Sequence, residues 1–80
     1  MSVTVRYYAG ARAAAGTTEE QVDAADVRSL VQTLGDRHGA RLAQVLAASS
    51  LLVDGIASTN SGTGLVNARL VEVLPPFAGG

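Results

Sequence analysis

The sequence predicts a single α+β domain in which a mixed sheet of about five strands packs on one main helix. A period of two in the hydrophobic residues between residues 2 and 8 predicts a strand, and helical spacing after Asp26 predicts a helix. The chain has 80 residues, about half the length of a typical domain, which is enough for one small core and too short for two.

Composition and charge exclude several classes of protein. The chain contains no cysteine, which excludes disulfide scaffolds, zinc ribbons and cysteine nucleophiles. Its net charge of −1 provides no electrostatic attraction to nucleic acid or to an anionic membrane. No apolar run approaches the ~18 residues of a membrane span, and no secretory signal is visible. We therefore expect a cytoplasmic protein with neither a nucleic-acid nor a membrane partner.

The first part of the chain predicts a hairpin. Residues 2–8 alternate between hydrophobic and polar side chains, which is the pattern of a strand. One face of this strand would carry Val3, Val5 and Tyr7. Residues 9–16 are rich in alanine and glycine and are expected to form a loop or one helical turn. Residues 17–22 favour a second strand that pairs with the first.

The middle of the chain predicts two helices. Asp26 is a suitable N-cap, and the apolar residues after it recur at helical spacing: Val27, Leu30, Val31 and Leu34. Gly39 would end this main helix. Gly35 inside the helix costs about 1 kcal/mol relative to alanine, which predicts a frayed or bent last turn. Residues 41–48 repeat the spacing weakly and predict a short second helix.

The last part of the chain predicts a second hairpin and a central strand. Residues 51–57 contain two short apolar runs around Asp54-Gly55, a dipeptide typical of hairpin turns. Residues 70–74 form an apolar run in which Glu72 is the only polar residue, and a strand this apolar is expected to lie in the middle of its sheet. The predicted order, β-β-α-(α)-β-β-β with the last strand central, is that of the β-grasp fold, the fold of ubiquitin.

Few side chains in the sequence are suited to chemistry. His38 is the only histidine; it ends the predicted main helix, where a cation is favourable, and has no partner of a suitable type nearby. The acidic stretch is expected to be a solvated strand edge rather than a pair of catalytic carboxylates; it contains Glu19, Glu20, Asp23 and Asp26. We therefore expect no metal site and no catalysis by the chain's own side chains.

The most unusual feature is the sequence after the last strand, Pro75-Pro76-Phe77-Ala78-Gly79-Gly80. The prolines fix φ and favour an extended exit from the domain, and the two glycines carry no side chains and could pass through a narrow channel. Six extended residues reach about 20 Å. We predict a β-grasp domain at residues 1–74 and a flexible, reactive C-terminal tail at residues 75–80; the alternative is a frayed terminus or an expression scar.

Several segments of the sequence match one family. They are the start at Val3–Gly16, the helix stripe at Val27–Leu34, the hairpin at Leu51–Gly55 and, most specifically, the Pro-Pro-hydrophobic-x-Gly-Gly end. Through them nearly the whole chain resembles the small sulfur-carrier subunit of molybdopterin synthase, in the ubiquitin-like group that also includes the thiamine-pathway sulfur carrier. The family commonly has an Asp-Gly-Asp-type turn before the last strand, where this chain has Asn67-Ala68-Arg69; Asn67 can still adopt a left-handed backbone.

The resemblance implies a sulfur carrier rather than an enzyme. An ATP-dependent adenylyltransferase related to ubiquitin-activating enzymes would adenylate the C-terminal carboxylate of Gly80, and a sulfur donor would convert it to a thiocarboxylate. The larger subunit of molybdopterin synthase would take the tail into its active site, which holds the catalytic side chains, and pass the sulfur to a pterin precursor. The chain itself would bind no cofactor, since the partner uses the ATP. The tail residues expected to bind partners are Pro75, Pro76, Phe77, Ala78 and Gly79.

Three other functions remain open. The sulfur could instead serve the synthesis of thiamine thiazole, cysteine or a secondary metabolite. From a different class, the chain could be a ubiquitin-like modifier joined through Gly80 to lysines of other proteins. The third alternative is an interaction module with an inert tail. For a sulfur carrier, we expect the sheet face and the tail, with Phe77 as an aromatic anchor, to form the partner surface more than the helix face.

Overall fold

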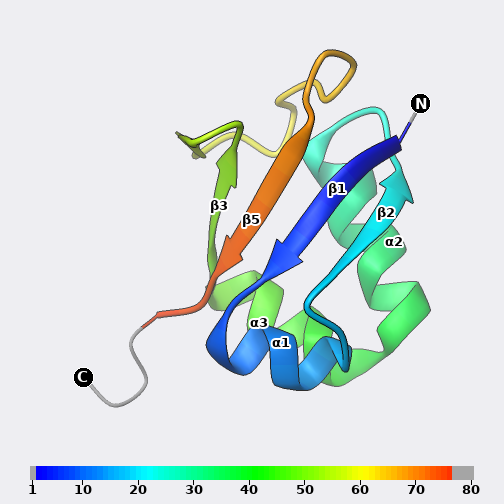
Figure 1. The fold of residues 1–80 in the computed structure, drawn as a ribbon, viewed down its shortest axis with the longest axis vertical. Coiled ribbons are helices and arrows are strands. Elements are labelled where there is room, and N and C mark those ends of the chain that lie inside the picture. Colours follow the sequence, from blue (N-terminus) through cyan, green and yellow to red (C-terminus); the bar gives the residue numbers. More distant parts are fainter. Residues whose placement is uncertain (1, 77–80) are drawn as a thin grey trace.

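A computed structural model describes residues 2–76 of the chain. Its elements follow one another in the order expected for this fold (Figure 1). They are β1 (Ser2–Tyr7), α1 (Ala9–Ala15), β2 (Glu19–Asp23), α2 (Val27–His38), α3 (Ala40–Ala48), β3 (Ser50–Val53), β4 (Ile56–Ser58) and β5 (Leu70–Leu74).

The five strands form one mixed sheet in the order β2-β1-β5-β3-β4. The two hairpins, β1-β2 and β3-β4, are antiparallel, and β5 lies between them, parallel to β1 and antiparallel to β3. The prediction that the last strand is central is therefore confirmed (Figure 1). The architecture is the predicted β-grasp fold.

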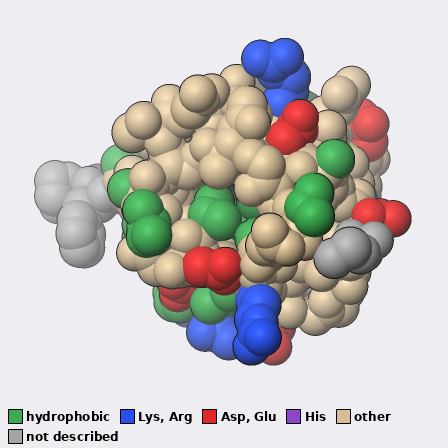
Figure 2. Space-filling view, turned by 90° about the horizontal axis from the view of Figure 1, so that it is seen from above, with side chains coloured by type: hydrophobic (Ala, Val, Ile, Leu, Met, Phe, Trp, Pro, Cys, Tyr) green, Lys and Arg blue, Asp and Glu red, His purple; other side chains and the backbone are tan. Residues whose placement is uncertain are grey.

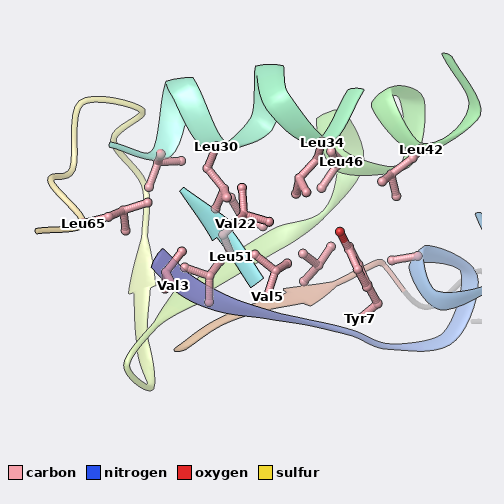
Figure 3. Close-up of a cluster of buried hydrophobic side chains, with 14 residues drawn as sticks. Val3, Val5, Tyr7, Val22, Leu30, Leu34, Leu42, Leu46, Leu51 and Leu65 are labelled. Carbon is pink, nitrogen blue, oxygen red and sulfur yellow. The ribbon is translucent and has the colours of Figure 1, made fainter. Parts of the chain in front are cut away.

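The helices cover one face of the sheet, and the hydrophobic core lies between the two layers (Figure 3). Alternate residues of β1 point into this core, as the period of two predicts, and Val71 and Val73 of β5 are 0% exposed. The α2 and α3 helices pack on these strands through four buried leucines: Leu30, Leu34, Leu42 and Leu46. Of the described residues, none that is buried is polar or charged.

The α1 helix is longer than the sequence predicts. It has seven residues, about two turns, where we expected a loop or a single turn. It ends as expected at Gly16, whose φ of 75° is left-handed and whose N–H donates to the carbonyl of Arg12. Ala11 buries its methyl group completely in the core, and Ala14 and Ala15 pack partly against it. These small side chains take the place of the bulkier apolar stripe that would have predicted a helix.

The α2 helix begins and ends where the sequence predicts. The carboxylate of Asp26 accepts a hydrogen bond of 2.8 Å from the backbone N–H of Ser29, and the helix ends at Gly39. The expected fraying after Gly35 is wrong, because the N–H of Gly39 donates to the carbonyl of Gly35 at 2.8 Å. Gly35 lies instead where α3 packs on α2: a β-carbon added there would lie 3.5 Å from that of Ala43.

Each helix of residues 2–76 is too short or too polar to cross a lipid bilayer. The longest, α2, has 12 residues, whereas a membrane span needs about 20.

Replacing Gly35 by alanine should stabilise the protein. The added methyl group would sit in ordinary van der Waals contact with Ala43, and alanine is favoured over glycine inside a helix by about 1 kcal/mol. We expect a rise in melting temperature of about 4–8 °C by circular dichroism. As a control, Gly39→Ala should lower it, because φ is 99° at this position. A lower melting temperature for Gly35→Ala would mean that the two helices need the glycine for close approach.

Candidate functional site

The predicted tail leaves the sheet from the end of its central strand. β5 ends at Leu74, and the chain continues through Pro75, which is half-buried, and Pro76, which is exposed. This exit lies at the end of the sheet where α1 and α3 are found (Figure 1). The predicted site residues Phe77, Ala78, Gly79 and Gly80 lie outside the described residues, so their roles stay predictions.

Strands on both sides hold β5 up to the exit. Leu74, its last residue, is paired with Ser50 of β3. On the other side, Tyr7 of β1 is paired with Val73, and the N–H of Tyr8 donates to the Val73 carbonyl at 3.3 Å. The chain therefore leaves the sheet from a fixed point, the end of β5.

The start of β5 is held by Asp54, the first residue of the β3-β4 turn. Its carboxylate Oδ1 accepts hydrogen bonds from the N–H groups of Arg69, at 3.0 Å, and Leu70, at 2.9 Å. Its own N–H donates to the carbonyl of Leu70 at 2.8 Å. Asp54 adopts a left-handed φ of 49°, whereas Asn67 does not adopt a positive φ. The strained position in this region is thus in the turn and not in the segment before β5.

The sheet face opposite the helices carries a mixture of apolar and paired polar side chains. Leu52, Leu70 and Leu74 are each half-buried on this face. Glu72, the single polar residue of β5, accepts a hydrogen bond of 2.5 Å from the Tyr8 hydroxyl. This contact explains how a central strand accommodates a carboxylate on its outer face. We call this surface the open sheet face.

Charged side chains of both signs lie beside one another on the surface of β1 and β2 and on the face that Figure 2 shows. Arg6 and Glu19 form an exposed ion pair of 3.0 Å between β1 and β2. Seen from the end of the molecule opposite α1, arginine side chains lie beside acidic ones, and hydrophobic side chains are scattered between them (Figure 2). On this face the described side chains form no basic patch of the kind that nucleic-acid binding requires (Figure 2).

A second group of polar side chains surrounds Glu20 on β2. The Tyr7 hydroxyl donates to Glu20 Oε2 at 2.5 Å, Arg37 Nη1 donates to Oε1 at 2.8 Å, and His38 Nε2 lies 2.5 Å from Oε2. The His38 ring also meets the Tyr7 ring edge-on, with 6.2 Å between centroids. These contacts join β1, β2 and the end of α2, and we call them the Glu20 cluster.

The Glu20 cluster corrects two expectations. His38 was expected to have no suitable partner and Glu20 to be solvated, but they lie against each other and their side chains are only 15% and 16% exposed. Burial raises the pKa of Glu20, and hydrogen bonds from Tyr7, Arg37 and His38 outweigh it, so the pKa lies below its ordinary value of 4.5. Burial also raises the pKa of the Tyr7 hydroxyl, which therefore remains a donor.

The members of the Glu20 cluster hold one another in place across three elements. Both carboxylate oxygens of Glu20 have partners within the cluster, and within residues 2–76 no buried side-chain nitrogen or oxygen lacks a partner. Among the same residues, no group of three His, Cys, Asp or Glu side chains is placed to hold a metal ion. The chemistry that the sequence suggests therefore depends on the tail.

Comparison with known proteins finds similarity in structure but not in sequence. No protein-family model matches the chain, and no curated protein does. Small archaeal modifier protein 1 of Haloferax volcanii superimposes with a TM-score of 0.84 at 22% identity, with 100% of both chains covered. The protein of the same name from Methanosarcina acetivorans gives 0.82 at 23% identity, covering 99% of this chain and 96% of its own.

A protein complex of subunits 1 and 2 of the molybdopterin-converting factor from Helicobacter pylori contains a third similar chain. Its TM-score is 0.75 at 22% identity, with 100% of both chains covered. The chain has the fold of these small proteins. The predicted resemblance is confirmed at this level, since modifier proteins and the molybdopterin-converting factor are its structural neighbours.

Removing the charge of Glu20 should change how stability depends on pH. Because its pKa is lower in the folded than in the unfolded chain, Glu20 stabilises the fold above pH 4.5, and this contribution is lost as the pH falls through the folded pKa. Glu20→Gln should lower the free energy of unfolding at pH 7 by about 1–3 kcal/mol and flatten its decline in acid. Urea titrations at pH values from neutral to acidic measure both effects.

The control is Glu19→Gln on the same strand. Its ion pair with Arg6 is about half exposed on both sides, and such pairs contribute at most about 1 kcal/mol. A Glu20→Gln protein as stable at pH 7 as this control, with an unchanged acid limb, would contradict the structural role of the Glu20 cluster.

Proposed function

We propose that this chain is a sulfur carrier whose C-terminal Gly80 carboxylate is converted to a thiocarboxylate. The sulfur would pass to a pterin precursor in molybdopterin biosynthesis, with this chain as the small subunit of the synthase. The observation that supports it most is the central strand β5, held on both sides and followed by Pro75 and Pro76. A β-grasp fold that releases a glycine-ended tail from this position is suited to present its end to other proteins.

The proposed chemistry needs a terminal carboxylate and partner enzymes. A carboxylate is a poor electrophile until one of its oxygens becomes part of a good leaving group. An adenylyltransferase provides this by joining the Gly80 carboxylate to the α-phosphate of ATP, with release of pyrophosphate. Hydrosulfide supplied by the sulfur donor then attacks the acyl carbon and displaces AMP, which leaves the thiocarboxylate. Since ATP is consumed on the partner, this chain needs no cofactor of its own, and we place the reaction in the cytoplasm.

The fold contributes positioning rather than catalytic groups. An enzyme that accepts the tail must find the Gly80 carbon at a fixed distance from the domain, because displacement of about 1 Å can cost on the order of 100-fold in rate. The paired strands around Leu74 supply the fixed point. We propose that the open sheet face and the tail, with Phe77 as its aromatic anchor, contact the larger synthase subunit. The Helicobacter pylori complex of two subunits supports a partner of this kind.

A second candidate function is protein modification. The two small archaeal modifier proteins have higher TM-scores with this chain than the molybdopterin-converting factor subunit. A modifier would use the same activated Gly80 carbonyl but would transfer it to a lysine amine of another protein. The products of the two functions differ in mass. Thiocarboxylate formation exchanges one oxygen for sulfur on this chain, whereas modification adds the mass of the whole chain to a target protein.

Deleting Gly80, or adding one residue after it, should abolish thiocarboxylate formation without unfolding the protein. Gly80 carries no side chain, so its loss removes none of the hydrophobic core formed by the described residues. Wild type, deletion and extension are incubated with ATP, a sulfur donor and the adenylyltransferase, and their intact masses are compared. Only wild type should gain the oxygen-to-sulfur exchange, while all three should have the same melting temperature. If the extended protein gains sulfur as fast as wild type, Gly80 is not the reactive group.

A further inference from the structure

A groove lies beside the point where the tail leaves the domain. It has a volume of about 320 Å³ and runs between α1, α3 and the two prolines that follow β5. Its lining residues are Gly10, Gln44, Val45, Ala48, Pro75 and Pro76. We call it the exit groove.

The exit groove is apolar and carries no charge on its described residues. Gln44 is its only polar side chain. On α3, Val45 and Ala48 are three residues apart and so lie on the same side of the helix. Val45 is half-buried and Ala48 is exposed, so the groove is an accessible extension of the core surface. Gly10 on α1 keeps the opposite wall free of a side chain, and a β-carbon there would meet nothing within 4 Å.

We propose that the exit groove receives an apolar side chain of the adenylyltransferase that activates Gly80. The inference rests on the proposed function and names a contact for its first step. Activation is common to the sulfur-carrier and the modifier interpretations, because both need an adenylated Gly80 carboxylate. The adenylyltransferase is therefore the partner that both interpretations require.

The tail is short, and this limits how far the adenylyltransferase can lie from the groove. Residues 77–80 span at most about 14 Å when fully extended. An enzyme that binds the Gly80 carboxylate in a water-excluding site must place protein around the tail, and hence within that distance of Pro76. Since Pro75 and Pro76 themselves line the groove, a partner surface that encloses the tail as far as Pro76 also contacts the groove.

The chemistry of the groove selects the kind of side chain. Its walls offer no ion-pair partner to a charged group, and burying an unpaired charge is strongly unfavourable. An aliphatic or aromatic side chain of the partner would instead bury apolar surface against Val45, Ala48 and the proline rings, which stabilises the complex. Such anchors in central pockets carry much of the energy of protein interfaces.

The test introduces a negatively or a positively charged side chain into the groove by substitution. Ala48→Glu and Ala48→Arg introduce opposite charges, and Ala47→Glu and Ala47→Arg are matched controls at an exposed residue of α3 that does not line the groove. The rate of ATP-dependent activation, followed as pyrophosphate release, is measured against carrier concentration for all five proteins, together with their melting temperatures. Both Ala48 variants should raise KM by about tenfold or more relative to wild type, with kcat and melting temperature nearly unchanged. The Ala47 pair should behave as wild type.

Three results would overturn the proposal. Equal KM values for the Ala48 and Ala47 variants would show that the groove is not covered. A lower KM for one charge at Ala48, with a higher KM for the other, would show that a charged side chain faces the groove. Both results leave wild-type activation intact and so spare the proposed function. Failure of the wild-type protein to be activated at all would remove the proposed function and the groove contact together.

Discussion

The parallel pairing of β1 with β5 is the constraint on which the rest of the structure depends. It joins Val5 to Val71 and Tyr7 to Val73, and all four side chains are at most 1% exposed. A parallel pair cannot be made by a short turn, and the chain between these strands supplies β2, three helices and the second hairpin. The same pairing fixes where the chain leaves the sheet, and it connects the core to the tail that we propose to be reactive.

Most of the fold could be predicted because its signals are local. Alternation in β1, the N-cap Asp26, the Asp54-Gly55 turn and the apolar run of β5 each specify an element within a few residues. The length of the α1 helix was underestimated because its core contacts are made by alanines, one buried and two partly buried, in a segment with little hydrophobic periodicity. The effect of Gly35 was misjudged for a different reason: its neighbour Ala43 lies on another helix, and helix propensity alone does not include that contact.

The candidate site also contains features that the sequence predicts and features that it does not. The exit at Pro75 and Pro76 could be predicted, since prolines after an apolar strand have a direct effect on the backbone. The Glu20 cluster was missed, because Glu20 is 13 residues from Tyr7 and 18 from His38 in the chain. Pairing of β1 with β2 and packing of α2 bring these residues together. Their spacing in the sequence does not predict that contact. The hydrogen bonds between Asp54 and the start of β5, most of which the Asp54 carboxylate accepts, were missed for the same reason.

The most direct test of a sulfur carrier is the intact mass of the protein isolated from cells that produce it. The mass is compared before and after treatment with a thiol-alkylating reagent, to which this cysteine-free chain offers no cysteine thiol. The proposed function predicts a population with one oxygen exchanged for sulfur at Gly80, and this population alone should react with the reagent. A chain that carries only the ordinary carboxylate and is found joined to lysines of other proteins would contradict it.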